Sequence, residues 1–116
     1  KVTDEALRFV DATGERYWEA ELYRLRGELL QMRGDIKAAE KAYDNAARVA
    51  RKQAARSLEL RAAMSMCRLR TTMGRREEGR QVLEPIYRWF GEGMNTPDLR
   101  EARTLLDEHS GQPVRL

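Results

Sequence analysis

The stretch RLRGELLQMRGDIKAAEKAYDNA, residues 24–46, decides how this chain is expected to fold. It is rich in helix-forming residues, yet it holds glycines at positions 27 and 34 and an aspartate directly after the second one. Glycine tolerates the left-handed conformation in which many helices end, and aspartate often begins the next helix, so Gly34 predicts a short turn between two helices. Gly27 lies inside the first helix, where a glycine costs about 1 kcal/mol relative to alanine, so it indicates close packing. The small and aromatic residues expected on the opposite side of that contact are Ala39, Tyr43 and Ala46.

Similar turn and capping residues divide the whole chain into helices. Charged residues make up 35% of the 116 positions, aromatic residues are few, and no stretch alternates apolar with polar residues over the length of a strand. The chain is therefore expected to be all-α. Its length fits a single domain, over residues 1–110, followed by a flexible tail over 111–116. We expect about six helices, with the approximate ranges 4–13, 15–33, 35–54, 57–73, 75–90 and 97–109.

Five of the six expected helices carry an apolar stripe at helical spacing, and these stripes are expected to face the core. In the helix over 15–33 the stripe consists of Trp18, Leu22, Leu25, Leu29 and Met32. In the helix over 35–54 it consists of Ile36, Ala39, Tyr43, Ala46, Ala47 and Ala50. In the helix over 57–73 it consists of Leu58, Leu60, Ala63, Met64, Cys67 and Leu69. The last two stripes are Val82, Leu83, Ile86, Trp89 and Phe90 over 75–90, and Leu7, Phe9 and Val10 over 4–13.

The chain also repeats itself weakly at an interval of 40 residues. This shift places Gly34 on Gly74 and Trp18 on Leu58. Further aligned sets are Ala6, Ala46 and Ile86, then Phe9, Val49 and Trp89, then Val10, Ala50 and Phe90. The pattern predicts a helical-hairpin repeat, in which one hairpin alone cannot bury its apolar stripe and its neighbours complete the core.

The first hairpin resembles the tetratricopeptide repeat, a helix-turn-helix family that places small, aromatic and glycine residues at fixed positions. The matching residues are Ala20, Tyr23, Gly27, Leu30, Gly34, Ala39, Tyr43 and Ala46. At the corresponding positions of the second copy stand Leu60, Ala63, Cys67, Arg70, Gly74, Gly79, Leu83 and Ile86, of which only Gly74 is a plain match. The resemblance implies antiparallel helical hairpins stacked as a short right-handed α-solenoid. The interval exceeds the family's usual spacing of about 34 residues, which implies longer helices.

A narrower resemblance covers most of the chain. The segments GERYWEAELYRLRGELL, SLELRAAMS and PIYRWFGEGMNTPDLREARTLLDE are similar to the C-terminal helical repeats of large bacterial signalling proteins. In such proteins a class III adenylate or guanylate cyclase domain, or another output domain, precedes an ATPase module and then the helical repeats. The resemblance implies that this chain is the C-terminal part of a larger protein whose catalytic residues all lie upstream.

The tetratricopeptide resemblance also implies where a partner would bind. In this family the first helix of each hairpin lines a concave face that binds extended peptides or helices. On this chain the implied concave-face residues are Glu21, Arg24, Glu28, Gln31, Arg61, Met64, Arg68 and Thr72. The implied partner is a protein, a peptide, or another domain of the same parent chain. Chaperone-binding members grip a terminal carboxylate with asparagines that are missing here, which argues against that partner.

No residue pattern in the chain predicts chemistry. Cys67 is the single cysteine and lies on an apolar stripe, and His109 is the single histidine. Metal sites need several imidazole or thiolate donors, so we expect no metal, no cofactor and no enzymatic activity. The single cysteine fits a reducing compartment and no apolar run reaches the length of a membrane span, which favours a cytoplasmic protein.

Two other functions are kept as alternatives. Residues 48–80 hold ten basic and three acidic residues, so this stretch carries a charge of about +7 and could attract nucleic acid or an acidic protein surface. The simpler interpretation is a solvated face whose arginines pack against acidic neighbouring helices, and nucleic acid is the less favoured partner. The other alternative is self-association as a homodimer through apolar surfaces at the ends of the array.

Overall fold

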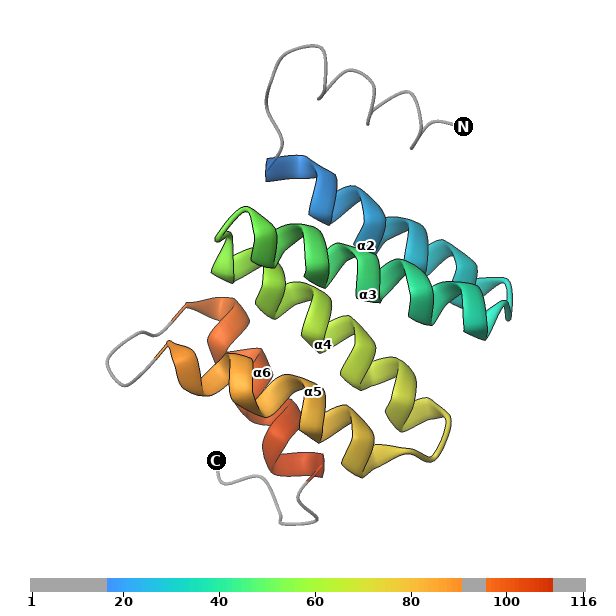
Figure 1. The fold of residues 1–116 in the computed structure, drawn as a ribbon. Helices are drawn as coiled ribbons and strands as arrows, with labels where there is room; N and C mark the ends of the chain where they lie inside the picture. Colours follow the sequence, from blue (N-terminus) through green and yellow to red (C-terminus); the bar gives the residue numbers. More distant parts are fainter. Residues whose placement is uncertain (1–16, 91–95, 110–116) are drawn as a thin grey trace.

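The computed structural model of the chain describes residues 17–90 and 96–109, and these form five α-helices (Figure 1). The helices are α2 (Tyr17–Met32), α3 (Ile36–Lys52), α4 (Arg56–Thr72), α5 (Arg76–Trp89) and α6 (Pro97–His109). No strand occurs in these two ranges, which confirms the all-α prediction. The helix predicted over 4–13 and the tail over 111–116 lie outside the described residues, so five helices are described where about six were expected.

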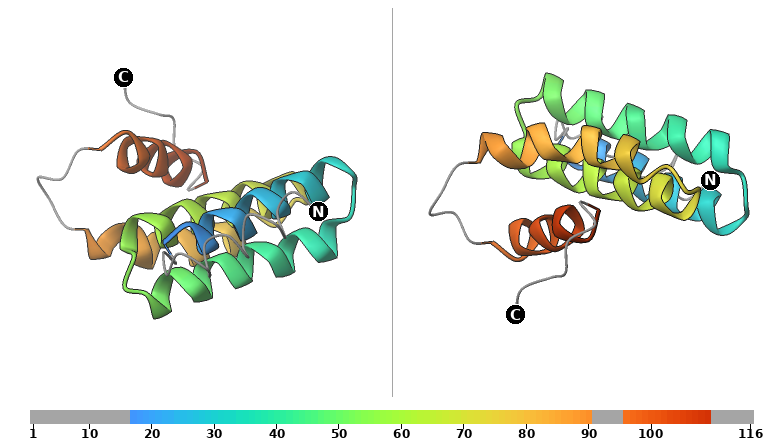
Figure 2. Two further views of the ribbon diagram at one scale, coloured as in Figure 1. Left: turned by 90° about the horizontal axis from the view of Figure 1, so that it is seen from above. Right: turned by 90° about the horizontal axis from the view of Figure 1, so that it is seen from below.

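Helix α4 is the centre of the arrangement, because it contacts each of the other four described helices. Consecutive helices run antiparallel and pack against each other (Figure 1). Both views of Figure 2 show α3 and α6 on opposite sides of α4. This central position explains why α4 is buried around most of its circumference, with a run of buried residues from Leu60 to Cys67 that only Arg61 interrupts.

The turns after α2 and α4 have the same geometry. Gly34 and Gly74 lie in the left-handed region, with φ of +82° and +76°. In each turn the residue after the glycine donates its backbone N–H to the carbonyl five residues earlier, at 2.9 Å in the first turn and 2.7 Å in the second. This is the capping pattern that satisfies the free carbonyls of a helix end. The two glycines therefore occupy equivalent bends, as the 40-residue register predicts.

The turn between α3 and α4 uses the same geometry with a different residue. Ala54 has a φ of +56°, and the next residue, Ala55, donates its N–H to the carbonyl of Ala50 at 2.8 Å. Among the described residues, Ala54 is the single non-glycine with a positive φ. Its methyl group makes this conformation unfavourable, so the turn is held by the packing of the two helices that it joins.

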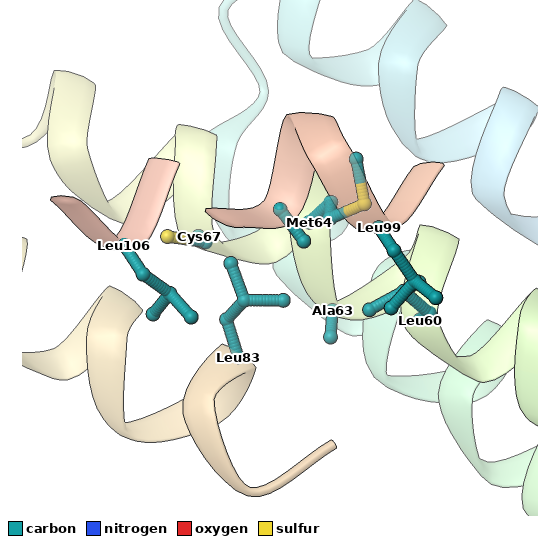
Figure 3. Packing of buried hydrophobic residues seen from close by; sticks show 8 residues of the cluster. Leu60, Ala63, Met64, Cys67, Leu83, Leu99 and Leu106 are labelled. Atoms are coloured by element: carbon teal, nitrogen blue, oxygen red, sulfur yellow. The ribbon is translucent and has the colours of Figure 1, made fainter. Parts of the chain in front are cut away.

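Two apolar clusters form the core. The larger joins α4, α5 and α6 through Leu60, Ala63, Met64, Cys67, Leu83, Leu99, Ala102 and Leu106 (Figure 3). The smaller joins α3 and α4 through Ala39, Tyr43, Met66 and Leu69. The stripes predicted for α3 and α4 are therefore confirmed in their central residues.

Gly27 packs against the ring of Tyr43. A β-carbon added to Gly27 would lie 2.5 Å from Cε1 of that ring, closer than two carbon atoms can approach. Tyr43 is itself buried, so its ring has little room to move. The prediction that Gly27 serves close packing is confirmed, and the group that it admits is an aromatic side chain.

The prediction that the apolar stripe of α2 faces the core is wrong. Four of its residues are exposed: Trp18, Leu25, Leu29 and Met32. The buried face of α2 is built instead from Ala20, Glu21 and Gly27, where small residues let α3 and α4 approach closely. Spacing alone identifies an apolar face, but it does not say which neighbour, if any, covers that face.

Two further details differ from expectation, and the start of α6 is capped. Trp89, predicted to face the core, is 56% exposed and lies under the guanidinium of Arg56, with 4.5 Å from Cζ to the ring centroid. Asp35 precedes α3 but makes no side-chain capping hydrogen bond. Thr96 does cap α6, because its Oγ1 accepts the N–H of Leu99 at 3.2 Å.

Candidate functional site

The residues predicted for a concave face lie on α2 and α4, which pack side by side. The structure brings most of them together along the line where the two helices meet. Two of them behave differently. Met64 is buried in the core, and the hydroxyl of Thr72 donates to the carbonyl of Leu69 in its own helix at 2.6 Å.

Glu21 is the centre of a charged cluster on this face. Its carboxylate accepts two hydrogen bonds from Arg24, both at 2.9 Å, and a third from Nη1 of Arg61 at 2.9 Å. Glu21 is nearly inaccessible to solvent. Burial alone would raise its pKa, but the hydrogen bonds and charges of the two arginines outweigh burial and hold the pKa of Glu21 below its usual value. The carboxylate is therefore ionised at neutral pH and ties α2 to α4.

The cluster continues to α6. Nε of Arg61 donates to Oδ2 of Asp98 at 2.9 Å, and Arg68 forms an ion pair with Glu101. Both pairs are partly exposed, so each contributes at most about 1 kcal/mol to stability. Their main effect is geometric, because they hold Arg68 and give Arg61 a second carboxylate partner beside Glu21.

A hollow of about 400 Å³ lies beside this cluster, between α2 and α4. Its lining residues are Glu28, Gln31, Met32, Tyr43, Ser65 and Arg68. Glu28, Gln31 and Arg68 were predicted for the concave face. Ser65 and Tyr43 were not predicted as site residues. Ser65 stands four residues after Arg61 and three before Arg68, so helical spacing could have placed it on their face.

The polar groups of the hollow are oriented by hydrogen bonds. Nη1 of Arg24 donates to Oε2 of Glu28 at 2.6 Å and to Oγ of Ser65 at 3.4 Å. The hydroxyl of Tyr43 donates to Oε1 of Gln31 at 2.7 Å. Burial, with a smaller contribution from the nearby Glu28 carboxylate, raises the pKa of Tyr43 to about 12, so the ring stays neutral. The hollow therefore offers a carboxylate, an amide, a hydroxyl and a guanidinium next to apolar surface.

A second hollow, of about 500 Å³, lies between α3 and α5 above α4. Its lining includes Ala62, Met66 and Val82, and Trp89 lies at its edge. Glu59, almost fully buried, accepts hydrogen bonds from Nε of Arg51 at 3.0 Å and Nη1 of Arg56 at 3.2 Å. The sequence did not predict this second hollow, the groove between α3 and α5, because its width depends on the distance between two helices that do not contact each other.

The arginines of the basic stretch 48–80 lie largely against carboxylates of the same chain. Arg48 pairs with Asp44 at 2.6 Å. Glu40 of α3 lies 3.4 Å from both Arg70 and Arg75. The stretch is thus balanced in space by acidic residues that lie outside it in the sequence.

Neither an exposed thiol nor a metal-binding cluster occurs in the part of the chain that the structure describes. Cys67 is fully buried, and burial raises the pKa of its thiol to about 11, which keeps it in the unreactive protonated form. Over residues 17–90 and 96–109, histidine, cysteine, aspartate and glutamate side chains nowhere gather in a group of three or more that could hold a metal ion. The side chain of His109 lies outside the described part. Of the described helices, none has both the length and the apolar character that a membrane crossing requires.

Comparison with protein-family models, with curated proteins and with solved structures finds no match to this chain. Its function is therefore inferred from its own residues.

Proposed function

We propose that this chain is a non-catalytic, tetratricopeptide-like module that binds an extended peptide segment of another protein in the hollow between α2 and α4. The convergence of oriented polar groups on that hollow, beside the exposed side chain of Met32, is the observation that carries the proposal. A peptide site needs both polar groups and apolar surface. The polar groups pair with the N–H and C=O groups along an extended backbone, and the apolar surface contacts the side chains of the peptide.

The fold part of the proposal is a short right-handed α-solenoid. Three observations support it. The turns at Gly34 and Gly74 are equivalent, consecutive helices form antiparallel hairpins, and α2 contacts α4 as α4 contacts α6. In a solenoid of this kind α2, α4 and α6 are the first helices of successive hairpins, which form the peptide-binding side.

Each lining group has a distinct use in this proposal. Gln31 and Arg68 donate hydrogen bonds to the carbonyl groups of a bound peptide, and Glu28 and Ser65 accept from its N–H groups. Met32 is 82% exposed and covers an apolar side chain of the peptide. Because Arg68 is also paired with Glu101, its guanidinium is held in position before the peptide arrives, which reduces the entropy lost on binding.

The wider role follows the sequence resemblance. We propose that the module forms the C-terminal part of a cytoplasmic bacterial signalling protein, and that peptide binding is relayed to an upstream output domain. Nucleic acid is a weaker candidate, because Arg48, Arg70 and Arg75 lie against carboxylates and are not directed together at an outside ligand. Duplex DNA binding that weakens steeply with salt would favour that alternative.

The test is a selection of peptides from a random display library on the purified chain, followed by affinity measurements on variants. Arg68→Glu and Gln31→Ala are expected to weaken the selected peptides by about tenfold or more. Lys37→Glu makes the same charge change at an exposed position of α3 and should leave the affinity unchanged. Equal affinity in all these variants would rule out the hollow as the site.

A further inference from the structure

Five apolar side chains lie along one side of α2, and four of them are exposed. We call Trp18, Leu22, Leu25, Leu29 and Met32 the α2 stripe. Its members are spaced by four and three residues in alternation, which places them along one side of the helix. Trp18 and Leu29 are each 57% exposed, although large apolar side chains at this spacing normally meet another helix.

The corresponding surface of α4 shows what such a stripe contacts in this fold. Forty residues after the α2 stripe stand Leu58, Ala62, Ser65, Leu69 and Thr72. Leu69 packs in a cluster with Ala39 and Tyr43 of α3, and Ser65 lies 3.4 Å from the guanidinium of Arg24 on α2. This surface of α4 therefore faces the hairpin that precedes it. By the same register, the α2 stripe faces the place of a hairpin that precedes α2.

The sequence before α2 matches the end of such a hairpin. Gly14 stands 40 residues before Ala54, the residue that adopts a positive φ in the turn between α3 and α4. A glycine takes that conformation without the penalty that alanine has. Before it, Ala6 and Val10 stand at the register of Ala46 and Ala50, both fully buried on α3.

We propose that residues 1–13 dock on the α2 stripe as a helix antiparallel to α2, in the place that α3 takes on α4. The residues of that helix that meet the stripe are Ala6, Leu7 and Val10. The small side chains of Ala6 and Val10 would fit between the large ones of the α2 stripe, as close helix packing requires. This inference rests on the repeat arrangement proposed above. It assigns the α2 stripe from Trp18 to Leu29 to the same chain, and it leaves Met32, at the end of the stripe, and the hollow between α2 and α4 to the partner.

The fluorescence of Trp18 tests whether residues 1–13 cover the α2 stripe. The chain holds two tryptophans, so Trp89→Phe leaves Trp18 as the single one. In this background we expect Trp18 to be protected from quenching by acrylamide. Ala6→Asp should raise the quenching constant severalfold, because it places a carboxylate in the contact. Ala12→Asp is the matched control, since position 12 stands at the register of the exposed Lys52 and the substitution is identical.

Three results would overturn the inference. One is equal quenching in the Ala6→Asp and Ala12→Asp variants. Another is protection that depends on protein concentration together with a dimer mass in light scattering, which would assign the α2 stripe to a second copy. The third is a Trp18 that is freely quenched in every variant. Circular dichroism confirms that α2 to α6 remain folded, and affinity for the selected peptide, measured in the same variants, shows separately whether the proposed function holds.

Discussion

Gly27 lacks a β-carbon, and this allows the two helices of the first hairpin to pack closely. The Tyr43 ring lies where any side chain at position 27 would begin, and its hydroxyl is held by Gln31 at 2.7 Å. The same ring thus links the packing of α2 against α3 to the lining of the hollow.

Gly27→Ala is expected to lower the free energy of unfolding by about 2 kcal/mol, because displacing a buried ring costs more than the gain in helix propensity. Urea denaturation measures this. Tyr43→Ala is destabilising by itself, but it should make the added Gly27→Ala substitution neutral or favourable, since the obstacle is gone. If Gly27→Ala cost the same in both backgrounds, the ring would not be the cause.

At Ala54 the opposite is expected, because its replacement by glycine should stabilise the protein. Its φ of +56° is unfavourable for any residue with a β-carbon. Ala54→Gly is therefore expected to raise the free energy of unfolding by about 0.5–1 kcal/mol in urea denaturation. Ala55 has an ordinary φ of −92°, so Ala55→Gly serves as the control and should be neutral or destabilising. A loss of stability in Ala54→Gly would contradict the assigned turn geometry.

At the scale of elements, the buried carboxylate of Glu21 joins α2 to α4 through its hydrogen bond with Arg61. Glu21 has a lowered pKa in the folded protein, so its contribution to stability is complete above the pKa of the unfolded chain and is lost as the pH falls through the folded value. Unfolding free energy should therefore decrease on acidification below about pH 4.5, near the usual pKa of a glutamate.

Glu21→Gln should reduce this acid sensitivity, although it lowers stability at neutral pH, because Arg24 and Arg61 lose their shared partner. Glu77→Gln, at an exposed position on α5, is the matched control and should keep the acid sensitivity of the wild type. Denaturation curves between pH 3 and 7 would reveal the difference. Identical acid profiles for Glu21→Gln and the wild type would show that the α2–α4 ion cluster is not formed.

The elements themselves were largely predictable from the sequence, and their orientation was predictable only in part. Gly34, Gly74 and Thr96 mark helix boundaries through local backbone chemistry, which the sequence carries directly. The inward face of α2 was predicted wrongly, because its small residues Ala20 and Gly27 give a weaker apolar signal than the exposed large residues. Pro85 lies inside α5, as the predicted helix over 75–90 implies, although a proline in a helix interior removes one backbone hydrogen bond.

At the scale of the whole molecule, α4 organises both the core and the proposed binding surface. It contributes to both apolar clusters, and on another side it meets α2 to form the hollow. The lining of the hollow was predictable where it follows the family resemblance, as for Glu28, Gln31 and Arg68. The pairing of Arg61 and Arg68 with Asp98 and Glu101 was not, because it depends on how α6 is placed against α4.

The proposed function makes one claim about this surface, that a peptide binds in the hollow between α2 and α4. Its most direct test is a titration of the isotope-labelled chain with a selected peptide, followed by mapping of the backbone amide shifts in NMR spectra. The largest changes are expected at Gln31, Ser65 and Arg68. Shifts concentrated instead at Met66, Val82 and Trp89 would place the peptide in the groove between α3 and α5 and would contradict the claim.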